Sequence, residues 1–185
     1  AIDRLERARS LDATYNEKEL RAMLFDAYVN EAKRLLDNQG SQAADVRMAI
    51  QHLSSALTLQ PQNQAIADIK RDAEAYLAGM VAFGSGEFDL AVARFKNLYD
   101  SKNDYVIHNA AQWLYDTYIA RGDTYRDGGR YTDALAQYRL AQTVTGVDTE
   151  VAKQRVEEIF AKYATPTPTV TPTRAAPNTR PPTNT

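Results

Sequence analysis

A helical-hairpin motif occurs twice in the chain, 43 residues apart. Gly79, Gly86, Phe88, Ala91 and Phe95 recur with the same spacing as Gly122, Gly129, Tyr131, Ala134 and Tyr138. A repeat of this length is typical of stacked helical units and not of a compact catalytic domain. Such stacks build long surfaces that bind other chains.

A shorter pattern extends the repeat toward the N-terminus. A small alanine is followed four residues later by a large apolar residue in the pairs Ala1/Leu5, Ala49/Leu53, Ala91/Phe95 and Ala134/Tyr138. A third apolar residue follows after three more, at Ala8, Ala56, Leu98 and Ala141. These spacings place all three residues on one helix face. We expect neighbouring helices to approach closely at the alanines and to pack around the bulky residues.

The pattern predicts a succession of helices up to residue 163. Their expected ranges are 1–13, 17–38, 44–59, 63–84, 87–100, 104–127, 131–144 and 148–163. Gly86 and Gly129 suit the left-handed backbone conformation that ends a helix. Pro61 stops the helix that ends near Leu59.

The last of these helices has an apolar stripe and a charged face. The stripe, which we expect to face the preceding hairpin, comprises Val156, Ile159, Phe160 and Tyr163. Charged residues on the other face suit a terminal, solvent-facing cap of a repeat array.

Residues 164–185 differ sharply from the rest of the chain. Eight of these 22 residues are threonine and six are proline, with no acidic residue. Such a segment buries too little surface to offset its ordering entropy, and it is expected to be a disordered tail or linker. Three roles stay open: a spacer or O-glycosylated stalk, a proline-rich ligand for an aromatic-lined groove such as that of a neighbouring copy, or no role.

The composition of the chain argues against several classes of function. The formal net charge is -2 and the basic residues are scattered, which gives no support for nucleic-acid binding. The chain has no cysteine, which excludes disulfides, thiol catalysis and thiolate ligands to zinc. His52 and His108 have no second ligand nearby at a metal-binding spacing, and no Ser/His/Asp set can be chosen. We therefore expect no enzyme activity, no cofactor and no metal site.

The sequence says less about the cellular compartment of the protein than about its function class. No stretch approaches the roughly 20 apolar residues that cross a bilayer, so we expect no direct membrane insertion. Ala1 falls within a repeat, and we expect the chain to be a fragment of a longer protein. The Thr/Pro-rich segment favours an exported or cell-surface part of a bacterial protein, with a cytoplasmic location left open.

At these repeated positions the sequence resembles the tetratricopeptide repeat (TPR) family. That family has a small residue in the first helix of each hairpin, a glycine at the turn, and an aromatic residue and an alanine early in the second helix. A large residue and another alanine follow. The unit that contains Gly122 fits throughout, and the unit that contains Gly79 departs only at Leu98, where the family usually has alanine. The repeat spacings of 48, 42 and 43 residues exceed the family's roughly 34.

The resemblance implies an all-α, right-handed superhelical solenoid of TPR-like helix-turn-helix repeats with a disordered Thr/Pro-rich C-terminal tail. The repeat domain would span 1–163. It would comprise a truncated half repeat (1–15), three repeats (16–63, 64–103 and 104–147) and a capping helix (148–163).

The resemblance also implies a binding groove on the concave face, lined by the first helix of each hairpin. Carried over onto this chain, the groove candidates are Tyr76, Met80 and Phe83, then Ile119, Asp123 and Arg126, and finally Val29, Lys33 and Leu36. The alternative for each apolar residue is that it simply packs against a neighbouring helix, because apolar stripes are normally core.

Two functions follow from these expectations. The first is a non-catalytic scaffold that binds a protein or peptide partner on the concave face. The alternative is a self-assembling structural component of a bacterial surface or envelope, in which copies stack head to tail as a homo-oligomer.

Overall fold

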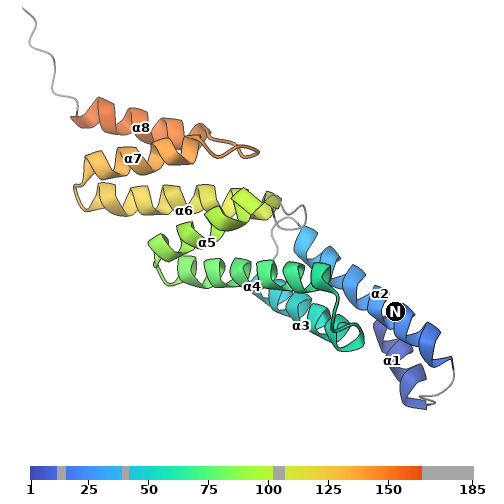
Figure 1. The fold of residues 1–185 in the computed structure, drawn as a ribbon. Coiled ribbons are helices and arrows are strands. Elements are labelled where there is room, and N and C mark those ends of the chain that lie inside the picture. Colours follow the sequence, from blue (N-terminus) through green and yellow to red (C-terminus); the bar gives the residue numbers. More distant parts are fainter. Residues whose placement is uncertain (12–15, 39–41, 102–106, 164–185) are drawn as a thin grey trace, which may run out of the picture.

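The computed structural model describes residues 1–11, 16–38, 42–101 and 107–163, and all regular structure within them is helical. The helices are α1 (Ile2–Leu11), α2 (Glu17–Asp37), α3 (Ala43–Leu59), α4 (Gln64–Gly84), α5 (Phe88–Ser101), α6 (Ile107–Asp127), α7 (Tyr131–Gln142) and α8 (Glu150–Tyr163) (Figure 1). These bounds confirm the predicted all-α class and lie close to the expected ranges. The predicted tail at 164–185 and the side chain of His108 lie outside the described residues.

The two repeated glycine turns have the same geometry. Gly86 and Gly129 both have a φ of 75°, in the left-handed region that favours glycine. In each turn the glycine N–H donates to the carbonyl of the residue three before it. The next N–H reaches back five residues, from Glu87 to Ala82 and from Arg130 to Tyr125. This paired pattern satisfies carbonyls that the helix end leaves free, so the sequence repeat is also a repeat of backbone conformation.

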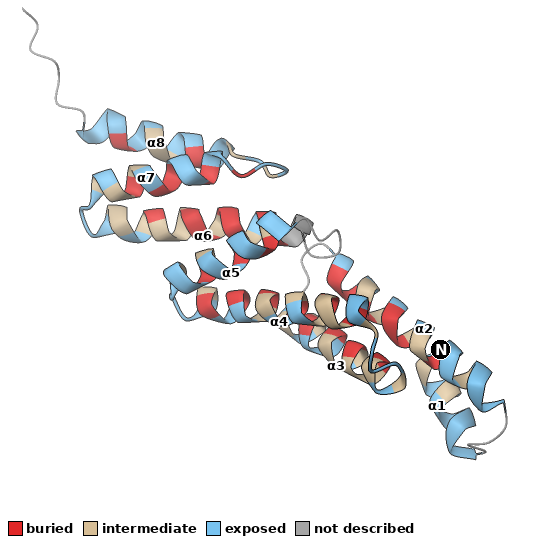
Figure 2. Ribbon diagram, viewed as in Figure 1, coloured by how far each residue is buried: buried red, intermediate tan, exposed pale blue. Residues whose placement is uncertain are grey.

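Each helix packs chiefly against the helices before and after it in the chain, and α4 also contacts α6. The helices therefore follow one another across the molecule, with α1 and α2 at one end and α8 at the other (Figure 1). Buried residues lie on the sides of the helices that face their neighbours (Figure 2). Among the described residues, no helix is both long and apolar enough to cross a membrane.

The repeated alanines and bulky residues lie in the core, as their spacing predicts. They are buried in α3, α5 and α7, where the sets are Ala49, Leu53 and Ala56, then Ala91, Phe95 and Leu98, and finally Ala134, Tyr138 and Ala141. The close approach is tightest at the glycines of the preceding helices. A Cβ atom built on Gly79 would lie 2.7 Å from the ring of Phe95, and one on Gly122 would lie still closer to the ring of Tyr138.

The helices at the two ends differ from this internal pattern. In α1 no residue is buried, and Ile2 and Leu5 are only partly covered by the core. In α8, Ile159 is buried but Phe160 is 47% exposed. The expectation that Phe160 faces the preceding hairpin is therefore wrong. Ala152, which the stripe left out, is buried instead.

Tyrosine hydroxyls hold α8 and the segment before it in place. The hydroxyl of Tyr115 on α6 accepts a hydrogen bond from the backbone N–H of Ala152, in the first turn of α8, at 3.2 Å. The amide groups of a first turn have no partner within their own helix, so Tyr115 supplies an acceptor to one of them. The hydroxyl of Tyr99 on α5 accepts the N–H of Thr145, between α7 and α8, at 3.0 Å. The first contact holds the start of α8 against α6, and the second holds the segment before α8 against α5.

Candidate partner-binding surface

The nine predicted groove residues lie on three helices, and their exposure differs. On α2, Val29 and Leu36 are buried and Lys33 is partly exposed. This helix packs mainly against α3 and α1, not against α4 or α6. The packing alternative therefore accounts for Val29 and Leu36.

On α4 the predicted residues meet an aromatic cluster. Tyr76 and Met80 are buried, and Phe83 is partly exposed. Phe83 contacts the ring of Trp113 on α6 edge-on, with ring centres 5.1 Å apart. Trp113 also stacks on Phe95 at 5.6 Å. These rings join α4, α5 and α6, so the contact between the two repeated hairpins is apolar.

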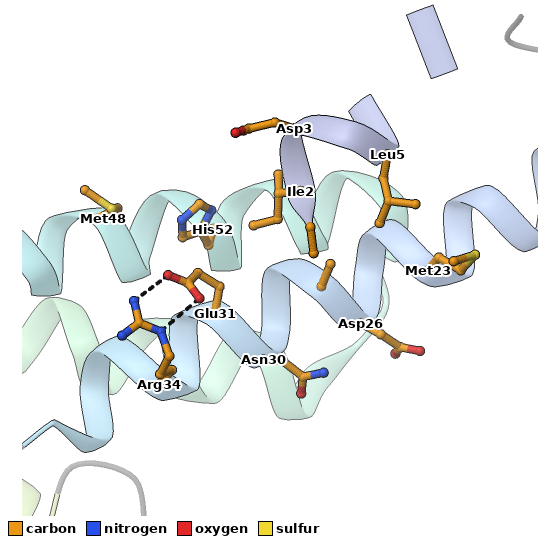
Figure 3. A pocket seen from close by; sticks show the side chains of 12 residues that line it. Ile2, Asp3, Leu5, Met23, Asp26, Asn30, Glu31, Arg34, Met48 and His52 are labelled. Carbon is orange, nitrogen blue, oxygen red and sulfur yellow. Dashed lines mark hydrogen bonds and ion pairs between the residues drawn. The ribbon is translucent and has the colours of Figure 1, made fainter. Parts of the chain in front are cut away.

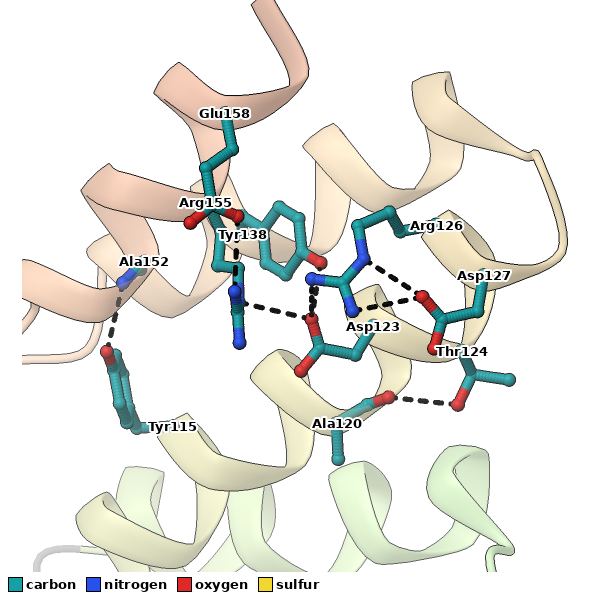
Figure 4. Close-up of polar contacts among 10 residues, drawn as sticks. All are labelled: Tyr115, Ala120, Asp123, Thr124, Arg126, Asp127, Tyr138, Ala152, Arg155 and Glu158. Atoms are coloured by element: carbon teal, nitrogen blue, oxygen red, sulfur yellow. Dashed lines mark hydrogen bonds and ion pairs between the residues drawn. The ribbon is translucent and has the colours of Figure 1, made fainter. Parts of the chain in front are cut away.

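On α6, Ile119 is partly buried against the hydrophobic core. The other two predicted residues, Asp123 and Arg126, belong to a charged network that reaches α7 and α8 (Figure 4). One oxygen of Asp123 pairs with Nη1 of Arg126 at 2.7 Å and accepts a hydrogen bond from the hydroxyl of Tyr138 at 2.8 Å. The same oxygen lies 3.3 Å from Nε of Arg155 on α8. That nitrogen is not aligned for a hydrogen bond, so the contact between Asp123 and Arg155 is an ion pair only.

Arg126 and Arg155 also form ion pairs with exposed carboxylates. Nη2 of Arg126 lies 3.0 Å from Asp127, and Nη1 of Arg155 lies 3.1 Å from Glu158. The side chains of Asp127 and Glu158 are 70% and 56% exposed, whereas that of Asp123 is 28% exposed. The network thus has a covered centre and two accessible ends. We use the name α6–α8 face for the surface formed by Asp123, Arg126, Asp127, Arg155 and Glu158.

The environment of the network shifts the pKa of two of its members. Burial and then the Asp123 carboxylate that accepts its hydrogen bond raise the pKa of Tyr138. Burial works to lower the pKa of Arg126, but the hydrogen bond to Asp127 and the nearby carboxylates outweigh it, and the pKa is raised. Both groups therefore keep their protons at neutral pH, Tyr138 as a donor and Arg126 as a cation.

A surface hollow of about 750 Å³ opens beside the network, between the end of α6 and α8. Arg126, Arg155 and Lys162 border it together with Asp127 and Glu158. Its aromatic wall is a stacked pair, Tyr131 and Tyr163, with ring centres 3.7 Å apart. The hollow combines both charge signs with an apolar wall.

The α6–α8 face occupies the place that the aromatic cluster holds one repeat earlier. Going forward 43 residues, Met80, Phe83 and Phe95 become Asp123, Arg126 and Tyr138. The junction between this hairpin and α8 thus has an ionic network beside an apolar core that contains Ile159 and Tyr138. The predicted site residues did not include Arg155, Glu158, Lys162 or Tyr163. The paired change of Met80 to Asp123 and Phe95 to Tyr138 is the sequence signal that could have indicated them.

Tyr76 and Tyr138 are both fully buried tyrosines, but only one hydroxyl has a partner. Among the described residues, no hydrogen bond to the Tyr76 hydroxyl meets the distance and angle required. Burial raises the pKa of Tyr76 to about 12, and the nearby Trp113 indole offsets this in part. The indole is therefore close to the hydroxyl without being aligned to donate to it.

Replacing Tyr76 with phenylalanine is expected to leave the free energy of unfolding unchanged or to raise it by up to about 1 kcal/mol, because a buried hydroxyl without a partner is costly. The matched variant Tyr138→Phe is expected to lower it by about 1–2 kcal/mol, because the hydrogen bond to a carboxylate is lost. Urea unfolding followed by circular dichroism measures both. Equal losses in the two variants would mean that the Tyr76 hydroxyl is satisfied in solution.

Comparisons with known proteins add no relatives. Searches of the chain against protein-family models, curated proteins and solved structures gave no significant match. Within the described residues, no group of three or more histidine, cysteine or acidic side chains is arranged to hold a metal ion.

Proposed function

We propose that this chain is a non-catalytic scaffold that binds a protein partner through an extended peptide segment at the α6–α8 face. The proposal takes the helical array to be a right-handed, TPR-like superhelix in which α2, α4 and α6 are first helices of hairpins. On that assumption α6 presents Ile119, Asp123 and Arg126 to the concave side.

The observation that carries the proposal is the hollow bordered by fixed charges. Asp123, held by Tyr138 and two arginines, keeps Arg126 and Arg155 in place before any partner arrives. Side chains that are already ordered lose little conformational entropy on binding, which favours affinity. The outer ion pairs, to Asp127 and Glu158, are exposed and contribute at most about 1 kcal/mol each to folding, so these two carboxylates are better suited to recognition than to stability.

The border of the hollow indicates the chemistry of the partner. Lys162 lies at the edge of the hollow with its ammonium over the ring of Tyr163. Within the described residues no carboxylate pairs with this ammonium, so it can meet an acidic side chain of the partner. Asp127 and Glu158 would meet basic side chains. An apolar or aromatic side chain of the peptide would rest against Tyr131 and Tyr163, because tyrosine offers a large contact area in interfaces. We therefore expect a segment that carries both charge signs near one apolar anchor.

Selection from a displayed peptide library tests this function. We expect the full chain to enrich a family of peptides with that charge pattern, and the double variant Asp127→Lys/Lys162→Glu to bind them about tenfold or more weakly. Both substituted side chains are exposed, so the fold is expected to persist. Lys96→Glu, which breaks an exposed ion pair with Asp100 on α5, is the matched control and should bind normally.

Two results would count against the proposal. One is the failure of any peptide family to emerge from the selection. The other is a family whose binding is unchanged in the Asp127→Lys/Lys162→Glu variant, which would place the binding surface elsewhere on the array.

A further inference from the structure

A second groove lies at the opposite end of the molecule, where α1 packs over α2 and α3 (Figure 3). It is lined by Ile2 and Leu5 of α1, Met23 of α2 and Met48 of α3. Met23 and Met48 are 55% and 47% exposed. Methionine side chains adapt to irregular partners, so this groove offers an apolar and adjustable lining.

Carboxylates outnumber cations around this groove. Asp3, Asp26 and Glu31 border it, and the cations are Arg34 and the amino group of Ala1, whose charge acts on Glu31. Arg34 is already engaged, because it donates two hydrogen bonds to Glu31 at 3.0 and 2.6 Å. Within the described part of the chain, no salt bridge involves Asp3 or Asp26. An occupant of the groove therefore needs apolar groups together with positive charge.

Residues 164–185 of this chain have that chemistry. The segment contains Arg174 and Arg180, has no acidic residue, and carries six prolines and Val170. Proline rings present apolar surface, and proline-rich segments lose little conformational entropy when they dock in an extended form. The two arginines would complement the two unpaired carboxylates of the groove.

We propose that the α1–α3 groove binds residues 164–185 of a second copy of this chain. The second copy is favoured because α8, which leads directly into this segment, lies at the opposite end of the row of helices from α1 (Figure 1). The contact would link copies end to end. This contact uses none of the residues of the α6–α8 face. A failed test of the contact would therefore not count against the proposed peptide-binding function, and the reverse also holds.

Fluorescence anisotropy of a labelled synthetic peptide with the sequence of residues 164–185, titrated with the full chain, tests the contact. We expect saturable binding that weakens about tenfold when Arg174 and Arg180 of the peptide are replaced by glutamate, since two charge pairs are lost. Asp26→Arg in the full chain should weaken the native peptide similarly. The glutamate-substituted peptide should then regain affinity for the Asp26→Arg chain.

Sedimentation velocity at increasing concentration separates a second copy from binding within one chain. We expect the full chain to associate as its concentration rises, and Arg174→Glu/Arg180→Glu to remain monomeric. Glu157→Lys, at an exposed acidic position on α8 outside the α6–α8 face, is the control and should associate like the unchanged chain. Absence of peptide binding, peptide binding that is insensitive to Asp26→Arg, or a full chain that stays monomeric would each overturn the proposal.

Discussion

Replacing Phe95 with alanine is expected to lower the free energy of unfolding by about 3–5 kcal/mol, the range for large-to-small substitutions of buried aromatic residues. The Phe95 ring is fully buried and contacts Tyr76 edge-on at 6.0 Å as well as stacking on Trp113. Its removal would leave three helices facing a cavity. Because folded domains are stable by only about 5–15 kcal/mol, we expect a large fall in the thermal midpoint measured by circular dichroism.

The same cavity gives the prediction an internal control. Gly79→Ala alone is expected to be destabilising, because the added methyl group would meet the Phe95 ring. In the Phe95→Ala background that space is open, and Gly79→Ala should then be stabilising by up to about 1 kcal/mol through the higher helix propensity of alanine. A change of sign between the two backgrounds is the expected result. If Gly79→Ala has the same effect in both, the glycine and the ring do not limit each other's packing.

Gly122→Ala is expected to lower the free energy of unfolding by about 1–3 kcal/mol, the range for overpacking a filled core. A Cβ atom at this position would collide with the ring of Tyr138. The ring has little room to move, because its hydroxyl is bonded to Asp123 and the side chain is fully buried. We expect the variant to lose part of the α6–α8 contact as well, which urea unfolding and peptide binding would both report.

Gly84→Ala is the matched control for Gly122→Ala. Gly84 is the last residue of α4, and no atom lies within 4 Å of the position that its Cβ would occupy. Alanine is the better helix former, so this variant should be neutral or more stable by up to about 1 kcal/mol. If Gly84→Ala and Gly122→Ala destabilise equally, the loss at Gly122 does not come from the Tyr138 ring.

The features that the sequence predicted are those that depend on local spacing. Helix bounds, the glycine turns at Gly86 and Gly129, and the buried faces around Ala91 and Ala134 all follow from backbone preferences and from which residues share a helix face. A period of three to four residues fixes these without knowledge of the neighbouring helices. The all-α class was predictable for the same reason.

Features that depend on how neighbouring helices are rotated were harder to predict. Phe160 and Ile159 are adjacent in sequence and both fit an apolar stripe, and the rotation of α8 buries one and exposes the other. That rotation is fixed by contacts from α6, through Tyr115 and Asp123. Likewise, Tyr76 satisfies the pattern of a groove residue, but how deeply it is buried depends on how closely the aromatic cluster packs over it.

The match between glycine and ring has a consequence for how such a chain can lengthen. Gly79 fits Phe95, and Gly122 fits Tyr138, within the same hairpin and across one turn. A duplication that copies a whole hairpin carries both halves of the match into the new copy. The smallest unit of this protein that contains a complete glycine–ring match is therefore the hairpin, which recurs after 43 residues, not the single helix.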